Sequence, residues 1–328
     1  MNVIDVDDVS KSYGDVRALD GLSLSVERGT TLGVFGTNGA GKTTLFKLLV
    51  GLNRPDSGTV TVASADPTDG TTVRERVRYL PEHAGFPPAL TGREILRFHA
   101  RMRSVPGDRR ERHVERILRT VGLADAADRR VGGYSNGMNR RLGLGTALVG
   151  EPAVLILDEP TAGLDPDGIR AFHDVVASLA AKTDVTIVFS SHALGEIQRL
   201  CEEAVIVADG RVAAAGPVED LRRAAADEVT VSLSFGSEAD AEDAAAALRD
   251  HGAALSVDRA GVDVTATAEP AAAYDLLTAV GDAYDIDRFE VREPGLEAAF
   301  HEAVGAGADA DATTPADSGA DDSGGEPA

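Results

Sequence analysis

The 328-residue sequence has one cysteine, no tryptophan and only four lysines. A single cysteine, Cys201, cannot form a disulfide within the chain, which is typical of proteins that fold in the reducing cytosol. The sequence also lacks any apolar run close to the roughly 20 residues that a membrane-spanning helix needs. Its first ten residues contain aspartates and no basic residue, unlike a signal peptide. These absences predict a cytoplasmic chain that does not cross a membrane by itself.

Positive charge is scarce, because 54 acids stand against 32 lysines and arginines and give a net charge of −22. Nucleic-acid-binding proteins present a basic surface, so we expect no nucleic acid as a partner. An acidic, lysine-poor composition is typical of adaptation to high salt, where screening shortens electrostatic repulsion, and it predicts a halophilic protein. Aromatic residues are also few, so the core must come mainly from alanine, valine, leucine and isoleucine.

Hydrophobic patterning divides the chain into three parts. Residues 1–225 alternate apolar runs with helical patterns, which is typical of an α/β domain with buried parallel strands. Residues 228–304 show the order β-α-β-β-α-β of the ferredoxin-like α+β fold, followed by a last helix at 295–305. Residues 305–328 contain no large aliphatic or aromatic side chain, so we predict a disordered acidic tail. In the first part the expected strands include 30–36, 153–159, 185–191 and 204–210, and the expected helices include 92–103 and 168–182.

A glycine-rich segment, GTNGAGKTT, lies between an apolar strand and a helical run. It matches the pattern G-x-x-x-x-G-K-[ST], which in that context binds nucleotide phosphates. Glycines let the backbone wrap closely around phosphate oxygens and direct N–H groups at them. Lys42 adds a charge for the β- and γ-phosphates, and the Thr43 hydroxyl is a ligand for Mg²⁺. The predicted phosphate-binding residues are Gly36, Thr37, Asn38, Gly39, Ala40, Gly41, Lys42, Thr43 and Thr44.

Two acids end the apolar strand AVLILDE. An apolar strand that ends in Asp downstream of a phosphate-binding loop is the Walker B arrangement, in which Asp158 holds Mg²⁺ through oxygen contacts. The next residue, Glu159, is placed to polarise the attacking water. These residues predict an enzyme that hydrolyses MgATP or MgGTP, and they do not decide between the two nucleotides.

The segment Ser135-Asn136-Gly137 precedes a basic helical run and has two interpretations. Serine or asparagine before a helix caps its first N–H groups. The same N–H groups point outward at the start of a helix, where they also bind anions. The choice between a cap and an anion site depends on whether a phosphate reaches this loop.

Together these motifs resemble the ATP-binding cassette (ABC) transporter ATPases over residues 1–225, with a helical subdomain at about residues 88–150. YSNGM stands where the family has its signature loop, and LDEPTAGLDP carries its Walker B motif and D-loop. His192 matches the switch histidine, Tyr13 matches the aromatic residue that stacks on adenine, and YLPEHAGF matches the Q-loop. The resemblance implies a P-loop NTPase fold that binds ATP and Mg²⁺ and hydrolyses ATP.

In that family two cassettes pair head to tail, and each ATP lies between one chain's P-loop and its partner's signature loop. Ser135–Gly137 would then cap a helix and also face the partner's γ-phosphate. The resemblance implies Lys42, Glu159 and His192 as catalytic residues, with Glu159 orienting water and His192 contacting the γ-phosphate. Asp165 would reach across the dimer, although a helix-capping role is equally natural for it. The other six histidines lack such a context and are expected at the surface.

Two segments depart from the family pattern. Asn136 and Met138 replace the usual glycine and glutamine of the signature loop, whereas its serine and second glycine are kept, so we expect a working loop. Glu82 replaces the usual glutamine of the Q-loop. Its carboxylate still offers oxygens to Mg²⁺ or water, but it adds negative charge beside the Walker B acids.

The ending EPGLEAAFHEAV resembles that of ABC ATPases that pair with separate export permeases of the drug-resistance type. We therefore expect a subunit that works with a membrane permease and with a second cassette, either its own copy or a paralogue. Through the permease it would lie on the inner face of the cell membrane. The alternative is a soluble ABC ATPase that acts on ribosomes or DNA. The single cassette, the short segment between Lys42 and Ser135, and the lack of a heptad run or basic patch disfavour it.

Overall fold

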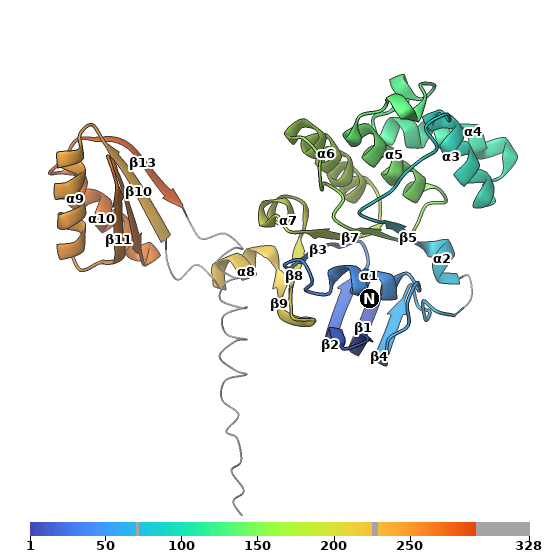
Figure 1. The fold of residues 1–328 in the computed structure, drawn as a ribbon, viewed down its shortest axis with the longest axis horizontal. Helices are drawn as coiled ribbons and strands as arrows, with labels where there is room; N and C mark the ends of the chain where they lie inside the picture. Colours follow the sequence, from blue (N-terminus) through green and yellow to red (C-terminus); the bar gives the residue numbers. More distant parts are fainter. Residues whose placement is uncertain (70–71, 225–228, 293–328) are drawn as a thin grey trace, which may run out of the picture.

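The computed structural model describes residues 1–69, 72–224 and 229–292, which contain three β-sheets (Figure 1). Two of the sheets belong to the first 224 residues, and the third belongs to residues 229–292. The helix expected at 295–305 and the acidic tail expected at 305–328 lie outside the described residues.

The larger sheet of the first part has the strand order β5-β6-β7-β3-β8-β9. All neighbouring strands pair in parallel except β9, which closes one edge antiparallel to β8. The central strands are buried along their whole length because both faces of the sheet are covered. The four predicted strands are found as β3, β6, β7 and β8. The bounds are β3 Thr31–Phe35, β5 Val77–Leu80, β6 Val154–Leu157, β7 Thr186–Ser191, β8 Glu203–Ala208 and β9 Arg211–Pro217.

Side chains of this sheet alternate between two hydrophobic cores. Leu155 and Leu157 of β6 belong to one core, whereas Val154 and Ile156 belong to the other. The second core is completed by a smaller antiparallel sheet and by helix α1, so α1 is held against the strand that precedes it. These elements are β1 Asn2–Tyr13, β2 Val16–Glu27, β4 Ser57–Val62 and α1 Lys42–Leu49. The loop between β3 and α1 is therefore fixed at the carboxyl edge of the parallel strands.

Helices fill the region predicted as a helical subdomain. A capping box of Thr91 and Glu94 starts α3. Arginines of α3 pair with acids of α4, as Arg97 does with Glu111 at 2.6 Å. At Gly145 of α5 an added Cβ would lie 3.2 Å from a side chain of α4, so glycine allows these helices to pack closely. The bounds are α3 Gly92–Met102, α4 Gly107–Thr120 and α5 Asn136–Leu148, with short 3₁₀ turns at Ala124–Ala126 and Val131–Gly133.

Four further helices complete the first part: α2 Thr72–Arg76, α6 Pro166–Lys182, α7 Leu194–Leu200 and α8 Val218–Ala224. The carboxylate of Asp165 caps α6, because it accepts a hydrogen bond from the backbone N–H of Gly168 at 2.7 Å. Among the residues that the structure describes, no helix has the length and apolar character needed to cross a membrane.

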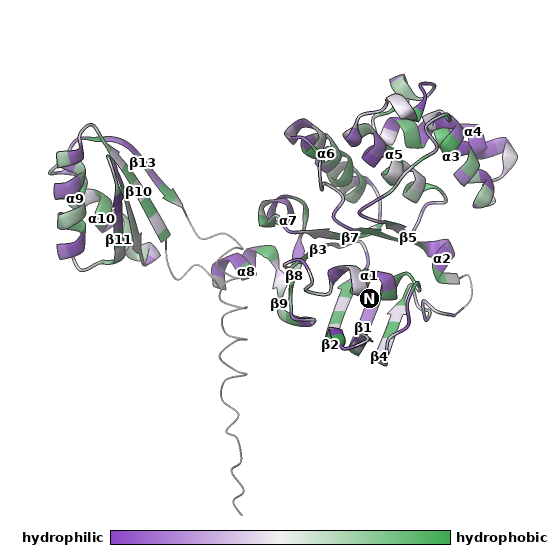
Figure 2. Cartoon of the chain, in the orientation of Figure 1, coloured by the Kyte–Doolittle hydropathy of each residue, from purple (hydrophilic) through white to green (hydrophobic). Residues whose placement is uncertain are grey.

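Residues 229–292 form an antiparallel sheet with the order β11-β12-β10-β13. Along β10 alternate residues are buried, and α9, which carries hydrophobic and hydrophilic segments in turn, packs its alanine-rich face on them (Figure 2). This part therefore has a hydrophobic core of its own. Its elements are β10 Val229–Phe235, α9 Glu238–Asp250, β11 Ala254–Ala260, β12 Asp263–Ala268, a 3₁₀ turn at Pro270–Ala272, α10 Ala273–Gly281 and β13 Ile286–Arg292.

Cys201 follows α7, and its thiol lies at the contact between α7 and β3. Cys201 is buried, and a Cβ added at Gly33 would lie 3.1 Å from its sulfur. Burial raises the pKa of this thiol, so the reactive thiolate is scarce even at about pH 8. We expect iodoacetamide to leave the native chain unmodified and to add one label to the denatured chain, as measured by intact mass. Equal labelling rates in the two states would contradict this packing.

Candidate active site

The loop between β3 and α1 is shaped by its glycines. A Cβ at Gly36 would lie 2.4 Å from the carbonyl oxygen of Val207, and Gly41 adopts a left-handed φ of 109°. Side chains are therefore excluded where the backbone must turn most sharply. Lys42 bends back over the loop, and its Nζ donates to the carbonyl oxygens of Gly36 at 2.6 Å and Thr37 at 3.2 Å. The loop borders a cleft of about 280 Å³ that is lined by Ala18, Thr37, Asn38, Gly39, Gly41, Lys42, Thr43, Thr44, Glu82 and Glu159.

Asp158 follows β6 and is held by side chains from three other segments. Its Oδ1 lies 3.4 Å from the Thr43 hydroxyl and accepts a hydrogen bond from Ser190 Oγ at 3.0 Å. Its Oδ2 accepts a hydrogen bond from the hydroxyl of Tyr79 at 2.9 Å. Burial and the neighbouring Asp158 carboxylate raise the pKa of Tyr79, so this hydroxyl stays a donor. The carboxylate is thus fixed beside Thr43 at the edge of the sheet.

Glu159 contacts both of the other predicted catalytic residues, Lys42 and His192. Its Oε1 lies 3.3 Å from Lys42 Nζ, and its Oε2 lies 2.9 Å from His192 Nδ1. Its backbone has a positive φ of 42°, which is strained for a residue with a side chain, and its N–H donates to Ser190 Oγ at 2.9 Å. The fold therefore brings Lys42, Glu159 and His192 together from the start of α1 and the ends of two strands.

The oxygen donors of the cleft suit Mg²⁺. Thr43 and Asp158 offer a hydroxyl and a carboxylate at one point, and Glu82, whose side chain is about half exposed, lines the same cleft. The described residues contain no group of three or more histidine, cysteine or acidic side chains that would hold a metal ion by itself. Hydroxyl and carboxylate oxygens are the protein ligands that Mg²⁺ takes together with water and substrate oxygens.

The Ser135–Gly137 segment is a helix cap in this structure. Ser135 precedes α5, and its hydroxyl accepts a hydrogen bond from the N–H of Met138 at 3.2 Å. None of its residues lines the P-loop cleft, and Asn136 instead borders a neighbouring cavity of about 650 Å³ that shares Glu82 with the cleft. An added Cβ at Gly137 would lie 3.4 Å from Gly168, so the starts of α5 and α6 are neighbours. Within one chain, the fold separates the signature loop and Asp165 from the phosphate-binding loop.

Tyr13 also lies outside the residues that line the cleft. It is 46% exposed, its hydroxyl bonds to the amide of Asn53, and the Nζ of Lys11 lies 5.8 Å from its ring centre. Ala18, on the following strand, does border the cleft. Stacking of Tyr13 on adenine therefore stays a prediction.

One expectation about histidines is wrong. His173 of α6 is buried at 3% exposure, with its Nε2 3.3 Å from Oε1 of Glu196. Glu196 also accepts hydrogen bonds from the hydroxyls of Thr161 and Ser191, both at 2.7 Å. Burial opposes ionisation of Glu196, but these hydrogen bonds keep its pKa below the ordinary value. His173 faces the core because α6 packs this side on β7, where Phe189 lies against its ring.

Several residues of the site were not predicted from the sequence. Tyr79 and Ser190 orient Asp158, and Arg140 of α5 is buried with its guanidinium bonded to backbone carbonyls. Two serines at the end of the apolar run VTIVFSS are a signal for Ser190, because polar residues inside a buried strand need partners. No local pattern distinguishes Arg140 from the neighbouring Arg141.

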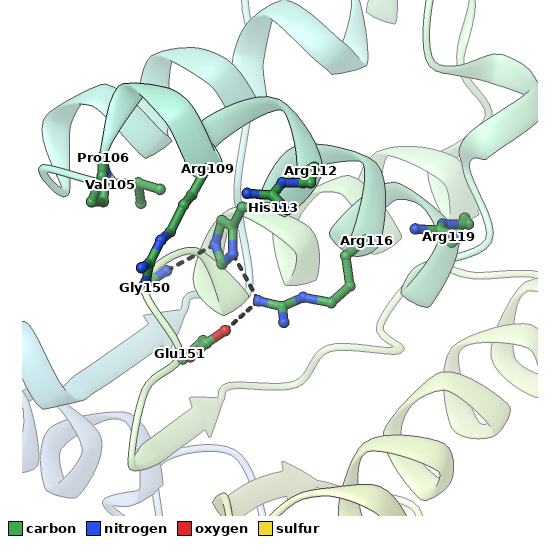
Figure 3. A pocket seen from close by; sticks show the side chains of 9 residues that line it. All are labelled: Val105, Pro106, Arg109, Arg112, His113, Arg116, Arg119, Gly150 and Glu151. Carbon is green, nitrogen blue, oxygen red and sulfur yellow. Dashed lines mark hydrogen bonds and ion pairs between the residues drawn. The ribbon is translucent and has the colours of Figure 1, made fainter.

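A larger cavity of about 710 Å³ lies on α4, away from these residues (Figure 3). Four arginines of one helix face border it, and Arg116 contacts both His113 and Glu151 there. It contains none of the predicted site residues. The smaller P-loop cleft, where the charged residues converge, is the candidate active site. The lining residues of the larger cavity are Val105, Pro106, Arg109, Arg112, His113, Arg116, Arg119, Gly150 and Glu151.

Comparisons with known proteins find ATP-binding proteins of transporters. The sequence profile described as ABC transporter matches residues 19–162. The daunorubicin resistance ATP-binding protein DrrA3 of Streptomyces coeruleorubidus is 41% identical over 220 residues, which is 67% of this chain and 69% of the relative. The bacitracin transport ATP-binding protein BcrA of Bacillus licheniformis is 36% identical over 222 residues, or 67% and 72% of the two chains. A solved structure of the ATP-binding subunit of an ABC transporter is 32% identical with a TM-score of 0.61, covering 68% of this chain and 92% of that one.

Proposed function

This chain belongs to the ABC transporter family of ATP-binding proteins, which hydrolyse ATP to drive transport, and we propose that it powers a membrane permease formed by a separate chain. The observation that carries the proposal is that Lys42 and Glu159 line one cleft, while His192 contacts Glu159 and Asp158 lies beside Thr43 at its edge. The relatives are named for daunorubicin resistance, bacitracin transport and Nod factor export, which supports export as the direction.

We assign the steps of hydrolysis to residues of the cleft. The N–H groups of residues 37–44 and Lys42 bind the β- and γ-phosphates, and Thr43 and Asp158 hold Mg²⁺ with Glu82 nearby. Bound Mg²⁺ would neutralise charge that develops on the phosphate oxygens. The Lys42 ammonium and His192 both contact Glu159, and a γ-phosphate that takes over these two contacts would leave Glu159 to orient the attacking water.

The proposed active unit is a head-to-tail pair of cassettes, formed by two copies of this chain or by this chain and a paralogue. The signature loop of one chain lies too far from its own cleft to line it. The free N–H groups of Asn136 and Gly137 at the start of α5 would meet the γ-phosphate bound by the partner. Asp165, at the neighbouring start of α6, would lie at the same interface.

A groove beside the cleft is the proposed docking place for the permease. It has a volume of about 300 Å³ and is lined in part by Leu52, Tyr79, His99 and Arg103. Leu52 and, on the adjacent helix α3, Phe98 and Met102 are exposed at 63%, 57% and 67%, an unusual gathering of apolar side chains for an acidic chain. Tyr79 borders the groove and donates a hydrogen bond to Asp158. The docking place is therefore connected through one side chain to the carboxylate that follows β6. Binding there would hold the chain on the inner face of the membrane.

Residues 228–304 are proposed as a ferredoxin-like accessory domain after an ABC cassette of residues 1–225. The order of strands and helices in residues 229–292 and the hydrophobic core that they enclose support this proposal. The acidic composition supports a protein adapted to high salt. We therefore propose molar KCl as the medium in which the chain is assayed.

The docking proposal predicts that Phe98→Arg prevents the chain from co-purifying with a co-expressed permease while ATP hydrolysis by the chain alone is unchanged. A charge in an apolar contact costs binding energy, whereas Phe98 lies outside the cleft. Leu255→Arg is the matched control, because Leu255 is exposed to the same degree as Phe98 but lies on β11, in the part formed by residues 229–292. Loss of co-purification in both variants, or in neither, would reject this groove as the docking place. Absence of Mg²⁺-dependent hydrolysis in the wild type, with or without permease, would reject the function itself.

A further inference from the structure

Arg140 is a buried arginine that makes no direct ion pair with any residue that the structure describes, although the nearby carboxylates of Asp158 and Glu82 favour its charge. It lies in the second turn of α5 and is 8% exposed. Its guanidinium has five N–H groups, and the structure shows five hydrogen bonds from it, all to backbone carbonyl oxygens. Nε donates to Pro160 at 2.5 Å, Nη1 to Pro81 at 2.6 Å and Glu82 at 2.8 Å, and Nη2 to Asp158 at 2.9 Å and Glu159 at 3.0 Å.

These five carbonyl groups belong to two segments that contain predicted site residues. Pro81 and Glu82 follow β5, and residues 158–160 follow β6. Burial lowers the pKa of Arg140 to about 10, so the side chain is still a cation at neutral pH. A buried cation needs compensation, and here the carbonyl dipoles of both segments supply it. The two segments are therefore held at a fixed separation by one side chain of α5.

The contact with Glu159 constrains a strained residue. Glu159 has the positive φ of 42°, and a side chain in that region persists only where surrounding bonds enforce it. Ser190 accepts the hydrogen bond of its N–H, and Arg140 donates to its carbonyl oxygen. Both backbone polar groups are thus held, and this conformation directs the carboxylate at Lys42 and His192.

We propose that Arg140 is a positioning residue for ATP hydrolysis: it fixes the backbone of Glu159 and joins the segment of Glu82, the end of β6 and the signature helix into one rigid unit. The proposal rests on the role proposed above for Glu159. Arg140 makes no hydrogen bond to residues 36–44, so it acts on turnover rather than on ATP binding. It also links the start of α5, which would face the partner's ATP, to the catalytic carboxylate of its own chain.

The test compares Arg140→Gln with Arg141→Gln in the full chain. Arg141 is the matched control, because its guanidinium also bonds to backbone carbonyls, those of Val121 and Gly122, but only within the helical subdomain. We expect Arg140→Gln to lower kcat for ATP by about 10- to 100-fold with KM within about twofold of wild type, since a small misplacement of a reacting group has effects of this size. Arg141→Gln keeps both constants.

A second measurement separates positioning from folding. We expect guanidinium ions at millimolar concentration to restore part of the turnover of Arg140→Ala, because the ion occupies the vacated site, and to do nothing for Arg141→Ala. An unchanged kcat in Arg140→Gln, a parallel loss of ATP affinity, or turnover in Arg140→Ala that guanidinium does not raise would overturn the proposal. Glu159→Gln in the same assay distinguishes the role proposed for Glu159 from the role proposed for Arg140. If Glu159→Gln is inactive and Arg140→Gln is fully active, only the role of Arg140 fails, whereas an active Glu159→Gln rejects the proposed role of Glu159.

Discussion

Glu159→Gln is expected to lower ATP turnover by about 100-fold or more, because general-base assistance contributes at least that much and an amide does not accept the proton of water. The substitution keeps the shape of the side chain between Lys42 and His192. It also removes a negative charge from the cleft that receives the triphosphate. ATP affinity is therefore expected to be equal to or higher than that of the wild type.

Steady-state hydrolysis and equilibrium binding of a fluorescent ATP analogue measure the two effects separately. Glu151→Gln is a suitable control, because Glu151 is exposed and lies at the α4 cavity, away from the P-loop cleft. A Glu159→Gln variant that hydrolyses ATP at the wild-type rate would show that another group orients the water. A variant that fails to bind ATP would show that Glu159 mainly shapes the cleft.

Ser135→Arg is the second substitution with a large expected effect. Ser135 caps α5 and lines none of the P-loop cleft of its own chain. If the start of α5 completes the partner's site, an arginine there blocks the approach of the two chains and lowers turnover by about 100-fold, as loss of charge-stabilising donors does in other enzymes. Binding of ATP to the single chain is expected to be unchanged. A control, Ser237→Arg, places the same residue at the cap of α9, in the part formed by residues 229–292.

Loss of ATP binding by Ser135→Arg would mean that the effect arises within one chain. Full activity would mean that the signature loop takes no part in hydrolysis. Loss of the α5 cap also costs about 1 kcal/mol of stability, so the thermal midpoint of the variant must be measured beside its activity.

The parts of the fold that depend on local sequence were predictable. The apolar runs that became β3, β6, β7 and β8 are continuous because both faces of their sheet are covered, and the P-loop is recognised from the consecutive residues 36–44. A helix cap was one of the two interpretations given for Ser135 and for Asp165 from their positions in the sequence, and both capping hydrogen bonds are present. Such features follow from neighbours in the sequence.

Features that depend on distant segments were not predictable from one sequence. Arg140 and Arg141 look alike in the chain, yet only the first reaches the carbonyls after β5 and β6, because the rotation of α5 on the sheet decides it. His173 was expected at the surface, but α6 turns it toward Glu196 in the core. The meeting of Lys42, Glu159 and His192 was implied by a family resemblance, and their mutual distances came only from the fold.

The central claim is that ATP is shared between the P-loop of one chain and the signature loop of another. Light scattering of Glu159→Gln with and without MgATP tests it most directly, since this variant is expected to hold ATP without consuming it. The account predicts that MgATP doubles the mass of Glu159→Gln and leaves Glu159→Gln/Ser135→Arg at the mass of one chain, although both bind ATP. The same ATP-dependent mass in both variants, or no change of mass in either, would contradict the shared site.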